Sequence, residues 1–106
     1  MKHLAISLAV LMLVWGGDAK AKNFYKSGNM LFAECTSTNP TDNVACMAYI
    51  SGVVDSSPVI CPPVTVVVGQ LRDIVTKYLK ENPATRHWNA TSLVQISLVA
   101  VFPCKK

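Results

Sequence analysis

The sequence has no C-x-x-C pair, although it contains four cysteines among its 106 residues. This absence excludes the spacing typical of a zinc knuckle or a thioredoxin-like redox site. Charged residues are also sparse, at 15% of the chain, and the net charge is only +4. Because the lysines and arginines are scattered, the composition does not indicate a protein that binds nucleic acid. No motif predicts a metal site or a cofactor.

Histidine is equally rare, because His87 is the only one beyond the first 21 residues. The acidic residues in that part of the chain form no close pair for general acid–base chemistry. A cysteine–histidine pair that uses His87 is the remaining catalytic alternative. This alternative is weak, because the chain begins with a segment typical of exported proteins, as described next, and the cysteines of such proteins are normally oxidised. We therefore expect a protein that is not an enzyme.

Residues 1–21 have the layout of a secretory signal peptide. A polar start with Lys2 is followed by an apolar run over 4–15, and Ala19-Lys20-Ala21 supplies the small-x-small pattern of a cleavage site. The apolar run is too short to span ~30 Å of hydrocarbon comfortably, which argues against a membrane anchor. We expect cleavage after Ala21, export across the inner membrane and no stable membrane insertion afterwards. The remaining residues, 22–106, form one domain with a net charge of +3.

Apolar residues recur at helical spacing in four segments, and no segment shows convincing strand alternation. The predicted helices span 27–35, 42–55, 65–81 and a fourth segment from 89 or 90 to 102, and Thr41 or Asp42 is expected to cap the second. The valines of 59–68 also suit a strand, but the preceding prolines favour a helix that begins at Thr65. The residues expected to face the core are Met30, Leu31, Val44, Met47, Ala48, Ile50, Val54, Val68, Leu71, Val75, Tyr78, Leu79, Ala90, Leu93, Val94, Ser97, Leu98 and Val101, with Phe24 and Phe32 as further candidates.

These segments predict an all-α fold, a small four-helix up-down bundle. An even cysteine count in a short exported chain indicates two disulfides, and the sequence alone allows three pairings. Short connections make successive helices antiparallel neighbours. That arrangement places Cys35 beside Cys46 at one end and Cys61 beside Cys104 at the other. It favours the disulfides Cys35–Cys46 and Cys61–Cys104, which contribute roughly 3 and roughly 4 kcal/mol by chain entropy.

The polar connection 82–89 is the predicted binding element. It carries Arg86, His87 and Trp88 together, and arginine and tryptophan are favoured anchors at protein interfaces. Loops held by a rigid scaffold are common binding elements. With Glu81 at the end of the third helix, these residues are the predicted partner-binding set. The alternative is that Trp88 folds back on the core as a lid.

The order of several short motifs resembles a known family. The motifs are Gly28-Asn29-x-Leu31 with Cys35, the run 46–55 (CMAYISGVVD), Cys61-Pro62-Pro63, Gln70-Leu71-x-x-Ile74-Val75-x-x-Tyr78-Leu79, Asn82-Pro83, Ala90-x-x-Leu93-Val94 and Phe102-Pro103-Cys104. Together they resemble the type VI amidase immunity (Tai-like) family, also called resistance-associated immunity proteins. The resemblance covers nearly all of 22–106.

The resemblance implies a small helical inhibitor in the periplasm. Its partner would be a peptidoglycan-cutting amidase delivered by a type VI secretion system, and the family's frequent dimers leave a homodimer open for this chain. The matched motifs indicate the fold more firmly than the partner. The rival interpretation from the residues is an exported carrier of small apolar ligands, because a cross-linked helical bundle rich in valine could enclose a cavity.

Overall fold

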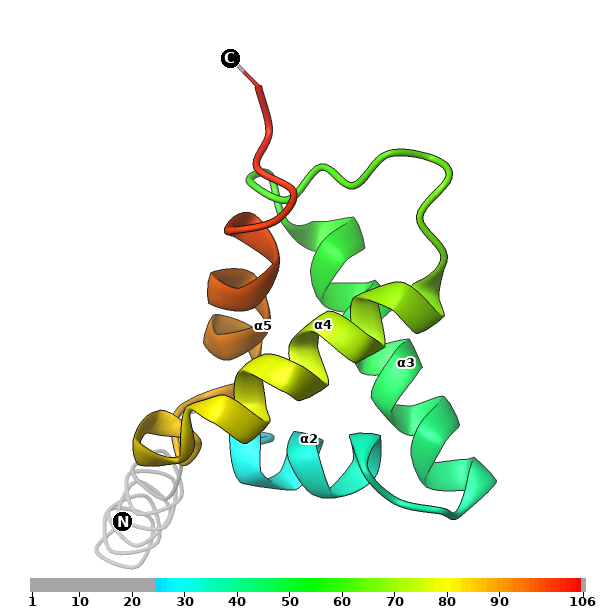
Figure 1. Cartoon of the computed structure of the whole chain (residues 1–106), viewed down its shortest axis with the longest axis vertical. Helices are drawn as coiled ribbons and strands as arrows, with labels where there is room; N and C mark the ends of the chain where they lie inside the picture. Colours follow the sequence, from blue (N-terminus) through cyan, green and yellow to red (C-terminus); the bar gives the residue numbers. More distant parts are fainter. Residues whose placement is uncertain (1–24, 106) are drawn as a thin grey trace, which may run out of the picture.

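The computed structural model describes residues 25–105, which form four helices packed around one core (Figure 1). The order is α2 (Gly28–Cys35), α3 (Pro40–Ser56), α4 (Val68–Glu81) and α5 (Ala90–Val99), with a 3-10 turn over Pro83–Thr85. Within these residues there is no strand, only the isolated bridges Ser27–Asn89 and Ile60–Pro103. The predicted all-α four-helix fold is confirmed.

Side-chain caps set where three of the helices begin. The Ser27 hydroxyl accepts from the Met30 amide, and the Asn39 and Asn89 side chains accept from amides two residues ahead. The predicted cap at Thr41 or Asp42 is wrong. Pro40, with its fixed φ, suits the first helical position, so α3 begins at Pro40 and Asn39 is its cap.

Two predicted helix bounds are also wrong. The third helix begins at Val68, because the Val66 amide donates to the Pro63 carbonyl at 3.0 Å in a turn that precedes it. The fourth helix ends at Val99, short of Phe102. Pro103 disfavours a helical conformation for the residue before it, and the chain leaves the helix in a turn.

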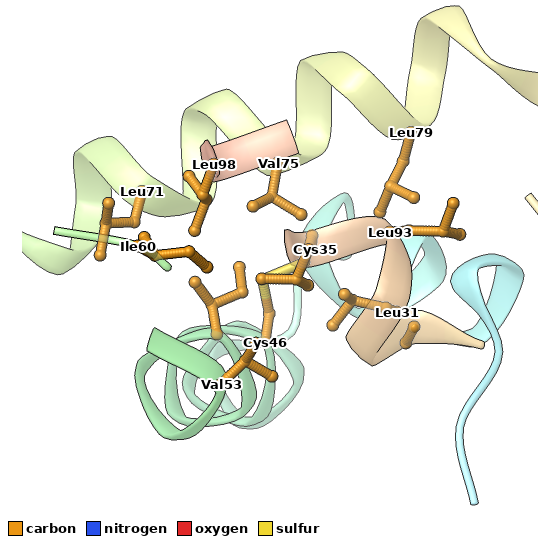
Figure 2. Close-up of a cluster of buried hydrophobic side chains, with 13 residues drawn as sticks. Leu31, Cys35, Cys46, Val53, Ile60, Leu71, Val75, Leu79, Leu93 and Leu98 are labelled. Atoms are coloured by element: carbon orange, nitrogen blue, oxygen red, sulfur yellow. A yellow bond between two sulfur atoms is a disulfide. The ribbon is translucent and has the colours of Figure 1, made fainter. Parts of the chain in front are cut away.

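The core lies where α4 crosses the other three helices, and Figure 2 shows its side chains between α3 and α4. The buried apolar residues are Leu31, Cys35, Cys46, Ile50, Val53, Ile60, Leu71, Val75, Leu79, Ala90, Leu93, Val94 and Leu98. The predicted buried faces of α4 and α5 are largely correct. Burying these side chains from water is the main force that holds the four helices together.

Five residues predicted to face the core are exposed instead, namely Met30, Val44, Ala48, Val68 and Val101. In α3 the buried positions are Cys46, Ile50 and Val53, which share one helical face. Val44 and Ala48 each lie two residues, about 200°, from a buried position and therefore point away. Phe24 lies outside the described residues.

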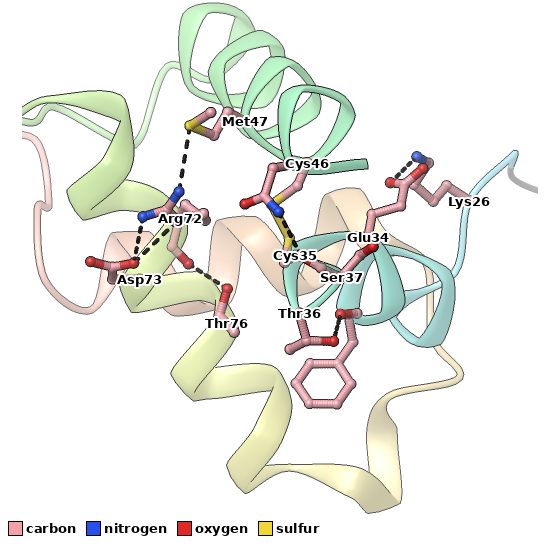
Figure 3. Close-up of a disulfide and its surroundings, with 12 residues drawn as sticks. Lys26, Glu34, Cys35, Thr36, Ser37, Cys46, Met47, Arg72, Asp73 and Thr76 are labelled. Atoms are coloured by element: carbon pink, nitrogen blue, oxygen red, sulfur yellow. Dashed lines mark hydrogen bonds and ion pairs between the residues drawn. A yellow bond between two sulfur atoms is a disulfide. The ribbon is translucent and has the colours of Figure 1, made fainter. Parts of the chain in front are cut away.

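Both predicted disulfides are present. Cys35–Cys46 joins α2 to α3 with a Cα–Cα distance of 5.1 Å. Cys61 and Cys104 are 43 positions apart in the sequence, and their Cα–Cα distance is 4.9 Å. The first bond, shown in Figure 3, is inside the core, whereas Cys61 is exposed. In Figure 1 the C-terminal segment lies beside the chain that leaves α3, where the second bond is formed.

The predicted signal peptide, residues 1–21, lies outside the described residues, so that boundary stays a prediction. Within 25–105, none of the helices is long and apolar enough to cross a membrane.

Candidate partner-binding surface

The predicted binding residues lie on one corner of the molecule, where α4 ends and α5 begins. Glu81, His87 and Trp88 are exposed, and Arg86 is partly buried. The chain turns sharply through the 3-10 segment, and the Trp88 amide donates to the Thr85 carbonyl at 2.9 Å. The connection 82–89 therefore presents two ring side chains, His87 and Trp88, on a tightly folded loop.

Trp88 is 47% exposed. A lid on the core would bury most of the indole, so Trp88 does not have the environment of a core tryptophan. An amphipathic ring with one exposed half is a common anchor at protein interfaces.

Arg86 is committed to contacts within the chain. Its Nε donates to Asn29 Oδ1 at 3.0 Å, and its Nη1 donates to the Leu79 carbonyl at 3.0 Å. The guanidinium carbon also lies 4.5 Å from the centre of the Phe32 ring. The side chain that sequence reasoning treated as an anchor for a partner thus joins α2 to the end of α4.

A second exposed area was not predicted as a site, namely the connection 57–67 and the C-terminal segment beside it. Val64 is fully exposed and Val67 is 61% exposed. A hollow of about 420 Å³ lies nearby and is lined by Pro58, Val59, Val99, Pro103, Cys104 and Lys105. The sequence signal was available, because no charged residue lies between Asp55 and Arg72.

Several polar side chains on α4 contact their neighbours. Arg72 donates to Asp73 Oδ1 at 3.2 Å and approaches the Met47 sulfur at 3.9 Å, while the Thr76 hydroxyl donates to the Arg72 carbonyl (Figure 3). Lys26 and Glu34, the latter in α2, form an ion pair. Among the residues that the structure describes, no group of histidine, cysteine and acidic side chains could hold a metal ion.

Comparison with known proteins places this cross-linked four-helix domain in a family of binding proteins. A family model of the Rap1a immunity proteins matches residues 27–104, from the cap of α2 to the last cysteine. The matched segment contains all four described helices and both disulfides. The chain therefore belongs to the Rap1a immunity proteins. Membership in this family implies that the chain binds a cognate effector protein. No curated protein matches the chain.

Proposed function

We propose that this protein is a periplasmic immunity protein that binds and inhibits a peptidoglycan amidase effector of a type VI secretion system. The observation that carries the proposal is the family match over residues 27–104. The signal-like segment 1–21 supports export, and export would bring the two disulfides into a compartment where such bonds persist. The protein would act as a stoichiometric inhibitor rather than as an enzyme.

The proposed mechanism is occlusion of the amidase cleft by the corner around residues 82–89. His87 and Trp88 project from a loop held between two helices, and Glu81 adds a charge next to it. Immunity needs tight binding, which usually depends on a few buried anchors at the centre of an interface of standard size. The half-exposed indole of Trp88 is the best such anchor on this corner.

The carrier interpretation receives no specific support. The hollow beside Cys104 lies at the surface between the C-terminal segment and the end of α3, and apolar side chains from all four helices fill the interior. A carrier would need an enclosed apolar chamber.

Inhibition of a purified amidase tests the function and the surface together. Protein recovered from the periplasm of an expressing bacterium is titrated into candidate amidases, and peptidoglycan cleavage is followed. The wild type should inhibit one amidase at near-equal concentration. Trp88→Ala should weaken this inhibition about 30-fold, the loss expected for an anchor worth ~2 kcal/mol. The matched control is Val64→Ala, which removes an exposed apolar side chain on the other connection.

Two outcomes would contradict the proposal in different ways. Should Val64→Ala weaken inhibition while Trp88→Ala and His87→Ala act as the wild type, the surface is wrong and the function stands. Should the wild type inhibit none of the amidases, or remain in the cytoplasm with residues 1–21 attached, the function itself is wrong. Mass spectrometry of the exported protein should find Lys22 as its first residue.

A further inference from the structure

Main-chain hydrogen bonds join the end of the connection 82–89 to the start of α2. The Gly28 amide donates to the Trp88 carbonyl at 2.8 Å, and the Ala90 amide donates to the Lys26 carbonyl at 3.0 Å. Ser27 and Asn89 form an antiparallel bridge at the same place. With the bond from the Trp88 amide to Thr85, both backbone polar groups of Trp88 are paired.

Gly28 is required at this contact because no side chain fits there. A Cβ on Gly28 would lie 2.5 Å from the Arg86 carbonyl oxygen and 2.3 Å from Leu93 Cδ1. Both distances are far shorter than an ordinary contact. The close approach of the two backbones therefore holds the Arg86 peptide directly against α2.

The Arg86 side chain adds contacts of its own to both α4 and α2. The Leu79 carbonyl that it contacts is among the last four of α4, which have no partner within the helix. The guanidinium therefore caps α4, while its bond to Asn29 and its stacking on Phe32 reach α2. A planar group with several donors can satisfy these contacts together, which the single ammonium of a lysine cannot do.

We propose that Arg86 is a positioning residue, and that its guanidinium holds residues 82–89 in the one shape that presents His87 and Trp88 to the effector. The effector then contacts the indole and the imidazole, and the guanidinium stays within the protein. This assignment of the effector's contacts rests on the proposed function. The positioning itself does not, because it concerns contacts within this chain.

Fluorescence of Trp88 tests the positioning without any partner. The sequence contains two tryptophans, and Trp15 lies in the segment 1–21 that export is expected to remove, so Trp88 is the single reporter in the exported protein. In this protein Arg86→Met removes the hydrogen bonds and keeps most of the side-chain length. It should raise the acrylamide quenching constant of Trp88 about twofold and add a fast component to its anisotropy decay, since a released loop moves on the nanosecond timescale. Helical content by circular dichroism should stay at the starting value.

Three further variants separate local positioning from general loss of stability. Asn29→Ala removes one acceptor from an exposed residue and should shift the quenching constant in the same direction by a smaller amount. Arg86→Lys should lie between the wild type and Arg86→Met. Lys80→Met, a change at an exposed basic residue of α4, is the matched control and should leave Trp88 unaffected.

Unchanged quenching and anisotropy in folded Arg86→Met and in Asn29→Ala would overturn the proposal. If Arg86→Met loosens Trp88 and also weakens inhibition of the amidase, both claims are supported. If it loosens Trp88 while the wild type inhibits no amidase, the positioning stands and the proposed function fails. If Trp88 keeps its wild-type fluorescence while inhibition is lost, Arg86 contacts the effector directly and the positioning claim is wrong.

Discussion

The two long connections of this protein are held in place by opposite means. The connection 57–67 is uncharged, and it is fixed near its start by the Cys61–Cys104 disulfide and by the buried side chain of Ile60. The connection 82–89 has no covalent link of its own. It is fixed near its end by the backbone hydrogen bond from Gly28 of α2 to Trp88 and by the contacts of the Arg86 side chain.

The difference shows which of the two is shaped for presenting side chains. Beyond Cys61 the first connection carries exposed valines, with few hydrogen bonds to the rest of the molecule. In the second connection the Trp88 amide donates a hydrogen bond to Thr85, and the Trp88 carbonyl accepts one from Gly28. A loop whose shape is fixed before binding loses less conformational entropy on binding, so the second is better suited to tight binding of a partner.

Removal of the Cys61–Cys104 disulfide should cause the largest loss of stability. We expect Cys61→Ala with Cys104→Ala to lower the free energy of unfolding by ~4 kcal/mol, because the bond closes the longer loop in the unfolded chain. Urea unfolding followed by circular dichroism measures the change. The emission of Trp88 should stay as in the parent, because this bond does not touch residues 82–89. A loss below ~1 kcal/mol would mean that noncovalent contacts suffice to hold the first connection.

Ile60 should be the second strongest determinant of the first connection. It is only 4% exposed, although its neighbours in the chain face solvent. Ile60→Ala should cost about 3 kcal/mol, through lost burial and the cavity left behind. The control Val64→Ala, at a fully exposed position, should stay within ~0.5 kcal/mol of the wild type. Equal effects of the two variants in urea unfolding would contradict the role given to Ile60.

Replacing glycine by alanine should lower stability at one site and raise it at another. Gly28→Ala places a methyl group against the Arg86 carbonyl and Leu93, and should lower stability by about 2 kcal/mol. Gly52→Ala in α3 meets nothing within 4 Å and should raise stability by ~0.5–1 kcal/mol. Thermal unfolding of both variants decides the comparison. A stable Gly28→Ala protein with unaltered Trp88 fluorescence would show that the close approach is not needed.

The smallest effects should come from the caps at the ends of the two connections. Asn89 caps α5 through its side chain, whereas Val67 precedes α4 without a side-chain cap. Asn89→Ala should therefore lower stability by ~1 kcal/mol, and Val67→Asp should raise it by up to ~1 kcal/mol. Thermal unfolding at low salt is the appropriate measurement. A destabilising Val67→Asp would indicate that the exposed valine has packing contacts worth more than a cap.

The fold could be predicted because its signals are local. The turn cluster around Asn39 and Pro40 marks the end of the first helix, and the expected positions of the helix ends favour the cysteine pairing that the structure shows. The register of α3 was missed because its many small and apolar residues fit two helical faces. Only contact with the other helices selects the face that carries Cys46 and Ile50.

The accessible connection 82–89 could be recognised from the sequence, whereas the contacts of its side chains could not. The polar composition of 82–89 showed that the connection is accessible. The role of Arg86 depends on Asn29, which is 57 positions away in the chain, and on a carbonyl that any residue would supply. Such a contact leaves no pattern in a single sequence, so the sequence alone gives no sign that Arg86 also contacts α2 and α4.

The Cys61–Cys104 bond has a topological consequence for the proposed binding corner. Residues 82–89 lie inside the covalent ring that this bond closes. A protease that cut the peptide bond between Arg86 and His87 would therefore open the ring without releasing a fragment, and α5 would stay attached through sulfur. A nicked molecule could keep both halves of the corner together, and only reduction would separate them.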